Sequence, residues 1–217
     1  MLEIKELLDL TKTIAAPLFE GRTYPWEVLP DIKDFIIELG NTLPEDEFEQ
    51  RSENVWVAKD ATVFPSAYIG SPCIIDHGAE VRHCAFIRGS AIIGKNTVVG
   101  NSTEIKNSIL FDNVQAPHYN YIGDSVLGYK SHMGAGSSNV KSDKTLVVIK
   151  SCEGEIETKR KKVGAILGDG VEIGCNSVLN PGTILGRGAS VYPTSCVRGV
   201  IPENGIYKDK DNIVIRK

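Results

Sequence analysis

The chain has 217 residues, 41% of them hydrophobic, and a formal net charge of −4 at pH 7, which suits one elongated domain or one domain with an appendage. This mild acidity gives no indication of a nucleic-acid-binding surface, and no apolar run approaches the roughly 20 residues that a membrane span requires. The first residues also lack the basic-then-apolar layout of a signal peptide, so we expect a cytoplasmic protein that binds neither nucleic acid nor membrane.

The cysteines are odd in number and form no CxxC pair, which argues against both a disulfide framework and a zinc knuckle. We expect them to be small buried hydrophobic residues. The five are Cys73, Cys84, Cys152, Cys175 and Cys196.

Residues 1–45 are predicted to form a helical hairpin. The apolar residues up to Ile14 recur roughly as one helix face, and Asp31 and Gly40 supply start and stop signals for a second helix. We expect this hairpin to cap the following domain or to add contacts in an oligomer, with docking of another protein as the alternative. The acidic and polar residues 46–54 are predicted to be a linker.

A strict six-residue repeat begins at Val57. An inward-type apolar residue recurs at every sixth position over ten positions, and a mostly small residue lies two positions before most of them. The apolar row consists of Val57, Val63, Ile69, Ile75, Val81, Ile87, Ile93, Val99, Ile105 and Phe111, and the period resumes in a new phase at Leu167, Ile173, Leu179, Leu185, Val191 and Val197.

Strands alternate with period 2 and helices with period 3.6, so a fixed period of six indicates short straight segments joined by regular corners. Three segments close a triangular coil of about 18 residues, with the aliphatic residues pointing inward. This predicts a mainly β fold, a left-handed parallel β-helix over residues 55–205, followed by a tail at 206–217. Proteins of this architecture usually associate through their flat sides, so a homotrimer is expected, although the fold alone does not define a function.

The repeat is interrupted around His118. Continuing the first phase puts Pro117 and Gly123 at the next inward positions, but aliphatic residues appear instead at Ile122 and Leu127. Two sides of the coil are therefore each one residue short. His118 is predicted to begin the irregular stretch, which also carries a run of polar and aromatic residues. Because shortened sides cost packing, we interpret the interruption as a functional site that re-aims His118 out of the coil.

Two cations stack beside this interruption. Arg88 and Lys106 each follow an inward aliphatic residue, and their separation along the sequence is one full coil. Stacked cations repel each other unless an anion lies between them, so the pair predicts a phosphate-binding column near His118. The alternative is two solvated surface charges.

Residues 137–163 are predicted to form an inserted arm, because the hexads stop after Met133. Two strand-like runs on either side of Gly154 indicate a hairpin in this arm. Its basic run at 159–162 is either a solvated edge or a second anion contact.

The stretch "APHYNYIGDSVLGYKSHMGAGS" resembles the acetyltransferase domain of bifunctional N-acetylglucosamine-1-phosphate uridylyltransferase/glucosamine-1-phosphate acetyltransferases. It looks closer still to the sugar-phosphate nucleotidyltransferases, many of them archaeal, that carry a similar C-terminal β-helix. The resemblance covers roughly residues 55 to 205 and includes the spacing of Arg88, Lys106, His118 and Tyr121. The pyrophosphorylase domain of that family is expected to be absent, because the segment that precedes the β-helix is too short to form one.

The resemblance implies a role for each matching residue. His118 corresponds to the catalytic base, and the family's asparagine before the "GAG" turn is His132 here. Asn139 is the candidate replacement for a family asparagine in the following loop. The implied substrate-binding residues are Arg88, Lys106, Tyr121, His132, Asn139 and Lys162, and the implied coenzyme-binding residues are Gly134, Ala135, Cys175 and Pro193.

The implied activity is acetyl-CoA-dependent N-acetylation of an amino-sugar phosphate or a nucleotide-linked amino sugar, with no metal required. A histidine can accept a proton near neutral pH, so His118 would deprotonate the 2-amino group that attacks the acetyl-CoA thioester. Backbone N–H groups at Gly134 and Ala135 would stabilise the oxyanion.

Two other classes of function stay open. The chain could be a non-catalytic sugar-nucleotide-binding subunit or regulator that partners a separate sugar-phosphate nucleotidyltransferase. A zinc carbonic anhydrase would need three histidines that meet at a subunit interface. Only His77, His83, His118 and His132 are present, and the first two lie on successive sides of one coil.

Overall fold

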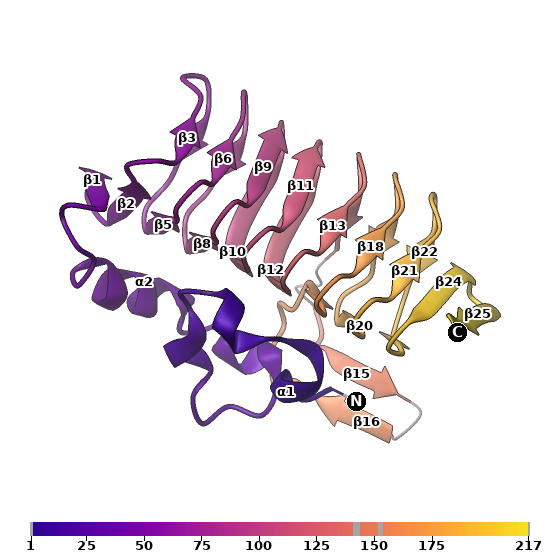
Figure 1. Ribbon diagram of the computed structural model, residues 1–217. Helices are drawn as coiled ribbons and strands as arrows, with labels where there is room; N and C mark the ends of the chain where they lie inside the picture. Colours follow the sequence, from indigo (N-terminus) through magenta and orange to yellow (C-terminus); the bar gives the residue numbers. More distant parts are fainter. Residues whose placement is uncertain (1, 141–143, 152–153, 217) are drawn as a thin grey trace.

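The computed structural model of the protein describes residues 2–140, 144–151 and 154–216. Its body is a three-sided parallel β-helix, in which the strands of consecutive coils stack side by side along one axis (Figure 1). The predicted fold class, mainly β with a parallel β-helix, is confirmed. We number the sides 1, 2 and 3 in chain order and name each corner by the two sides that it joins.

Each side is built from short strands, one per coil. Side 1 contains β2 (Val55–Ala58), β5 (Cys73–Ile75), β8 (Ala91–Ile93), β17 (Ala165–Leu167), β20 (Thr183–Leu185) and β23 (Val200–Ile201). Side 2 contains β3 (Thr62–Val63), β6 (Glu80–Val81), β9 (Val98–Asn101), β11 (Gln115–His118), β13 (His132–Met133), β18 (Glu172–Ile173), β21 (Ser190–Val191) and β24 (Gly205–Asp209). Side 3 contains β4 (Tyr68–Ile69), β7 (Phe86–Ile87), β14 (Ser138–Asn139), β19 (Val178–Leu179) and β22 (Cys196–Val197), while β10 (Glu104–Leu110) and β12 (Tyr121–Leu127) run through sides 3 and 1.

The predicted inward rows form the core of the β-helix. Ile75 pairs in register with Ile93, its equivalent in the next coil, and both side chains are fully buried. The small residues two positions earlier, such as Ala79 and Ala91, are buried as well. Burial of one such aliphatic side chain contributes about 1.5–3 kcal/mol, so the stacked rows supply much of the stability of the coil.

The first shortened side lies before His118. Ile93 pairs with Leu110 and not with Phe111, so one residue is missing between Ile105 and Leu110. Phe111, which the six-residue count placed inward, lies at the next corner, where its buried ring packs edge-on against an aromatic ring of the N-terminal segment.

The second shortened side lies after His118. Leu110 pairs with Leu127, so the other missing residue falls between Ile122 and Leu127. The two deletions flank the side that carries His118, and this side keeps its full length. The prediction that the irregularity begins at His118 is therefore wrong: the shortened segments are at the 3–1 corner, where β10 and β12 continue as unbroken strands.

The N-terminal segment is less helical than predicted. Helix α1 spans only Ile4–Leu7, where a helix up to Ile14 was expected, and α2 spans Ile32–Gly40. Asp9 accepts the backbone N–H of Thr11, and Pro17 removes a backbone donor, so the chain forms short turns instead of one continuous helix. These turns are η1 (Leu10–Lys12), η2 (Ala16–Phe19) and η3 (Pro25–Val28).

The N-terminal segment covers side 1, as Figure 1 shows for α2 beneath β5, β8 and β10. The outward-pointing residues of this side are aliphatic and fully buried, in contrast to the outward residues of an exposed coil. This second aliphatic line, which recurs once per coil in parallel with the inward row, was not predicted from the sequence. Its members are Ile74, Ile92, Ile109 and Val126.

Three further segments complete the chain. The predicted linker at 46–54 is instead largely β1 (Phe48–Ser52), which pairs antiparallel with β2. The arm contains the predicted hairpin, formed by β15 (Val148–Ser151) and β16 (Gly154–Glu157), and the tail folds back through β25 (Asn212–Ile215) against β24. Among the described residues, no helix has the length and apolarity needed to cross a membrane.

Asp76 is a buried carboxylate at the 1–2 corner. Its Oδ1 accepts the backbone N–H of His77 at 2.7 Å, whereas Oδ2 has no hydrogen-bond partner among the described residues. Burial raises the pKa of Asp76 above its ordinary value of 3.8 and outweighs the attraction of Lys95. The charged form of Asp76 is therefore unfavourable in the folded protein.

We expect Asp76→Asn to raise the free energy of unfolding at pH 7 by about 1 kcal/mol or more, because the amide keeps the Oδ1 acceptor and removes the buried charge. Since the folded-state pKa is raised, the carboxyl group costs nothing below its ordinary pKa and becomes destabilising as the pH rises through the folded-state value. The gain should therefore shrink towards acidic pH. The predicted gain can be measured by urea unfolding across this pH range. The samples are the wild type, Asp76→Asn and the exposed control Asp34→Asn, and a less stable Asp76→Asn protein at pH 7 would contradict the prediction.

Candidate active site

His118 lies at the end of β11, on the 2–3 corner, with an exposed side chain. Its backbone carbonyl accepts the N–H of Gly136 from the next coil at 3.0 Å. The same contact repeats along the corner, because the carbonyls of Ala135 and Cys175 accept N–H groups of the coils that follow. The structure therefore brings the predicted base and the predicted coenzyme-binding residues into one line that runs from coil to coil and ends at Pro193. We call the level of one coil in this stack a rung.

The turn Gly134–Ser137 lies on the rung next to His118. The N–H of Gly134 donates to the carbonyl of Ile173 at 2.8 Å, so it is committed to the coil and cannot serve as the predicted oxyanion donor. The N–H of Ala135 has no hydrogen-bond partner among the described residues. Of the two donors predicted from sequence, Ala135 is therefore the one that the geometry supports.

Asn120 connects His118 to this turn, and sequence analysis missed it. Its side chain is buried, and Nδ2 donates to the carbonyls of Gly134 at 2.8 Å and Ser137 at 3.1 Å. Its Oδ1 accepts the backbone N–H of His118 at 3.3 Å. One amide thus fixes the histidine segment and the turn relative to each other.

Among the described cysteines, only Cys73 follows the prediction of burial. Cys73 is buried, and burial raises the pKa of its thiol to about 12. Cys84, Cys175 and Cys196 are exposed, because they lie at a corner or on the outer surface of side 3 and not in an inward row. Cys152 lies outside the described residues.

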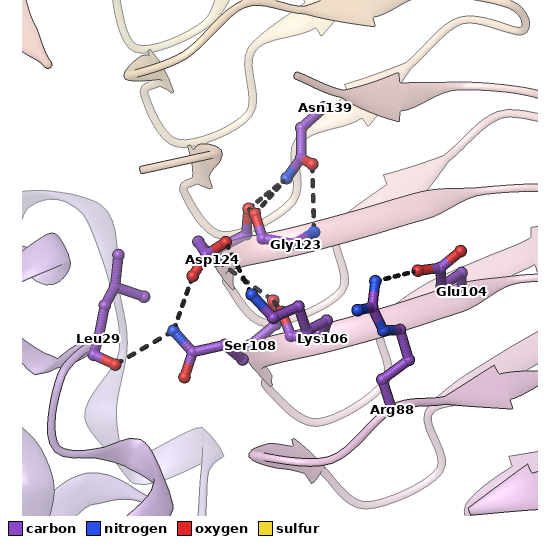
Figure 2. Close-up of polar contacts among 10 residues, drawn as sticks. Leu29, Arg88, Glu104, Lys106, Ser108, Gly123, Asp124 and Asn139 are labelled. Atoms are coloured by element: carbon purple, nitrogen blue, oxygen red, sulfur yellow. Dashed lines mark hydrogen bonds and ion pairs between the residues drawn. The ribbon is translucent and has the colours of Figure 1, made fainter. Parts of the chain in front are cut away.

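Lys106 lies across side 3 from His118, at the 3–1 corner. Its Nζ lies 3.8 Å from Oδ2 of Asp124, whose side chain is almost fully buried (Figure 2). The other carboxylate oxygen accepts Nδ2 of Asn107 at 2.9 Å, and the same Nδ2 contacts the carbonyl of Leu29 in the N-terminal segment. The two shortened corners therefore place a half-buried cation beside a buried carboxylate.

Arg88 lies one rung before Lys106 and has a carboxylate partner of its own. Its Nη1 donates to Glu104 Oε1 at 2.9 Å, and Figure 2 shows the two cations on neighbouring strands of this corner. The predicted stacking of Arg88 and Lys106 is present, because Ile87 and Ile105 pair in register directly before them. Each cation has a carboxylate nearby, so the repulsion between the two cations is offset without a bound anion.

Tyr121 lies on the outer surface of side 3, between the two corners. It pairs in register with Glu104 on the preceding rung and with Ser138 on the following rung. His118 and Tyr121 belong to the same coil, so the predicted base, the tyrosine and the two cations lie on side 3 or at one of its two corners.

Two predicted substrate ligands lie elsewhere. His132 projects from side 2, where its Nδ1 contacts Glu172 Oε2 at 2.9 Å. Asn139 is buried, and its side-chain amide forms hydrogen bonds with residues of the 3–1 corner. Its Oδ1 accepts Gly123 N–H at 3.1 Å, and its Nδ2 contacts Ser125 Oγ (Figure 2). The contacts of Asn139 therefore hold the corner, and its role as a substrate ligand stays a prediction.

Lys162 is exposed at the base of the arm. Two residues later, the N–H of Gly164 donates to the carbonyl of Asp124 at 2.8 Å, so the returning chain crosses the corner that carries Lys106. Within one subunit, the histidines lie at separate corners and sides of the coil. His77 contacts Asp60 at 3.0 Å at the 1–2 corner, and His83 contacts Ser66 at 3.1 Å at the 2–3 corner.

The coils and corners define a hexapeptide-repeat β-helix protein. Comparison with known proteins adds which sequences this chain resembles. Residues 69–157 match the family described as the GMPPB C-terminal domain. A bifunctional protein GlmU from Methanococcus maripaludis is 33% identical over 114 residues, which cover 51% of this chain and 27% of that protein. A bifunctional sugar-1-phosphate nucleotidylyltransferase/acetyltransferase from Sulfurisphaera tokodaii is 33% identical over 92 residues, which cover 42% of this chain and 23% of that protein.

These matches confirm the resemblance predicted from the sequence over about half of the chain. The chain spans only about a quarter of the length of these curated relatives. Among solved structures, the polySia-specific acetyltransferase NeuO aligns with 72% of this chain and 81% of its own, at 15% identity and a TM-score of 0.45. A likeness at this level indicates neither substrate nor mechanism.

Proposed function

We propose that the protein is an acetyl-CoA-dependent N-acetyltransferase that acts on an amino-sugar phosphate or a nucleotide-linked amino sugar. The observation that carries the proposal is the line formed by His118, Ala135, Cys175 and Pro193 on successive rungs of one exposed corner, with Lys106 and Tyr121 on the adjoining side. The S. tokodaii relative, whose name includes acetyltransferase activity, supports the same class of reaction.

In the proposed reaction, the amine of the sugar attacks the thioester carbonyl of acetyl-CoA. A C–N bond forms, the C–S bond breaks, and His118 takes the proton from nitrogen and passes it to the departing thiolate. The N–H of Ala135 is positioned on the neighbouring rung to donate to the oxyanion. Asn120 keeps these two groups at a fixed separation, because it bonds to the backbone of both segments.

Lys106, with Arg88 and Lys162, is proposed to hold the phosphate of the substrate. Lys106 is half-buried, so a phosphate oxygen that reaches it displaces little water and forms a charge-assisted contact. Holding the phosphate fixes the sugar relative to His118, and such orientation lowers the barrier of a two-substrate reaction. His132 and Asn139 are left out of this proposal, and acetyl transfer proceeds without a metal.

The test is a screen of amino-sugar 1-phosphates and nucleotide-linked amino sugars for thiol release from acetyl-CoA, with mass spectrometry of the acetylated product. An enzyme releases one thiol per acetylated amine. Binding of a sugar nucleotide without any turnover would favour the alternative, a non-catalytic subunit or regulator of a separate sugar-phosphate nucleotidyltransferase.

The proposed assembly is a homotrimer, with the exposed corner and side 3 of one subunit facing a neighbour. The N-terminal segment already covers side 1, so sides 2 and 3 are the surfaces left for contacts between subunits. Light scattering at micromolar concentration checks this, and a monomer would contradict both the trimer and a site shared between subunits.

A further inference from the structure

Side 3 carries two exposed aromatic residues that the proposed reaction does not use. Tyr68 and Phe86 are 61% and 43% exposed, and their rings meet edge-on with centroids 5.5 Å apart. They occupy consecutive rungs, since Tyr68 pairs with Phe86 in register. Two exposed aromatic rings in contact on one face form a candidate contact surface for a ligand or another molecule.

The aromatic pair is collinear with the site. Phe86 pairs with Glu104, and Glu104 pairs with Tyr121, so the outward residues form one continuous line along side 3. Arg88 and Lys106 flank this line at the 3–1 corner. Three rung spacings separate Tyr121 from Tyr68, or about 14 Å at the usual 4.7–4.9 Å between strands.

We infer that Tyr68 and Phe86 form the stacking surface for the base of a nucleotide-linked amino sugar, whose amine lies at His118. This inference rests on the proposed function and narrows its substrate class. A free sugar phosphate does not extend over three rungs, whereas a second phosphate, a ribose and a base add the required length. Every nucleobase presents a flat face, and stacking on an aromatic side chain contributes about 1–3 kcal/mol per base.

The charges along the line fit such a ligand. Arg88 lies level with Phe86 and Lys106 level with Glu104, both at the 3–1 corner beside the line, where they can contact the diphosphate. Glu104 can accept hydrogen bonds from ribose hydroxyl groups. Because Glu104 and Asp124 offset both cations, the diphosphate alone would bind weakly. Stacking of the base then supplies binding free energy that does not depend on charge.

The first test uses uridine diphosphate and inorganic pyrophosphate as calorimetric probes of the whole chain. We expect uridine diphosphate to bind more tightly than pyrophosphate, and Tyr68→Ala/Phe86→Ala to weaken it by about tenfold or more while leaving pyrophosphate unchanged. Ile215→Ala, an exposed aliphatic residue on β25, is the control and should change neither. Equal binding of the two probes, or unchanged binding of uridine diphosphate to the double variant, overturns the inference.

A kinetic arm separates this inference from the proposed function. The double variant should raise the KM for a nucleotide-linked amino sugar and leave the KM for acetyl-CoA unchanged. If the wild type acetylates no amino sugar but binds uridine diphosphate through the aromatic pair, the proposed function fails and the binding site stands. If the double variant loses its oligomeric state in light scattering and keeps its affinity for uridine diphosphate, the aromatic pair contacts a second copy of the chain and the inference is wrong.

Discussion

His118→Ala is expected to lower the rate of acetyl transfer by roughly 10²–10⁴-fold, the usual range for loss of a positioned general base. The melting temperature should stay nearly unchanged, because the imidazole is exposed and the side of the coil that carries it has full length. Raising the pH should recover part of the lost rate, since more of the substrate amine is then already deprotonated. Steady-state thiol release from pH 6 to 9, with thermal unfolding of the same samples, measures both effects.

His132→Ala is the matched control, because its side chain projects from side 2 and contacts Glu172. It should retain the wild-type rate. A fully active His118→Ala protein would place the base elsewhere, and an unfolded one would mean that the histidine stabilises the corner.

Lys106→Ala is expected to raise the KM for the phosphorylated sugar by about tenfold or more, because a charge-assisted contact contributes on the order of 1.5–3 kcal/mol. The KM for acetyl-CoA should change much less. The variant should also lose stability, since Asp124 is buried and Lys106 is a cation beside it. Kinetics with each substrate varied separately, together with urea unfolding, test both effects.

The double variant Lys106→Ala/Asp124→Asn distinguishes a phosphate contact from a structural role. Asparagine keeps an oxygen for Asn107 and removes the buried charge, so stability should return. The raised KM should persist if Lys106 binds phosphate. Recovery of the KM together with stability would show that Lys106 acts only by neutralising Asp124.

The line of His118, Ala135, Cys175 and Pro193 was predicted through the family resemblance, which assigned a role to each of these four positions. The prediction did not include Asn120 or Asp124, whose contacts form between different coils. Asn120 is an inward polar residue in an otherwise apolar or small row, and that departure was the available signal. For Asp124, the available signal was its position in the second shortened segment. The six-residue count had placed the start of the irregularity at His118 instead.

The sequence by itself determined the β-helix, because each hexad specifies one short strand, one inward aliphatic residue and one corner, and these choices are local. Only the tertiary structure decided where the missing residues fall. Leu110 and Phe111 are both apolar, so the pattern permits either to point inward. Pairing of Leu110 with Ile93, and packing of Phe111 against Phe19, select one register. The same holds for Lys106 and Arg88, because their carboxylate partners lie nearly a full coil away in the sequence and meet them only when neighbouring coils stack.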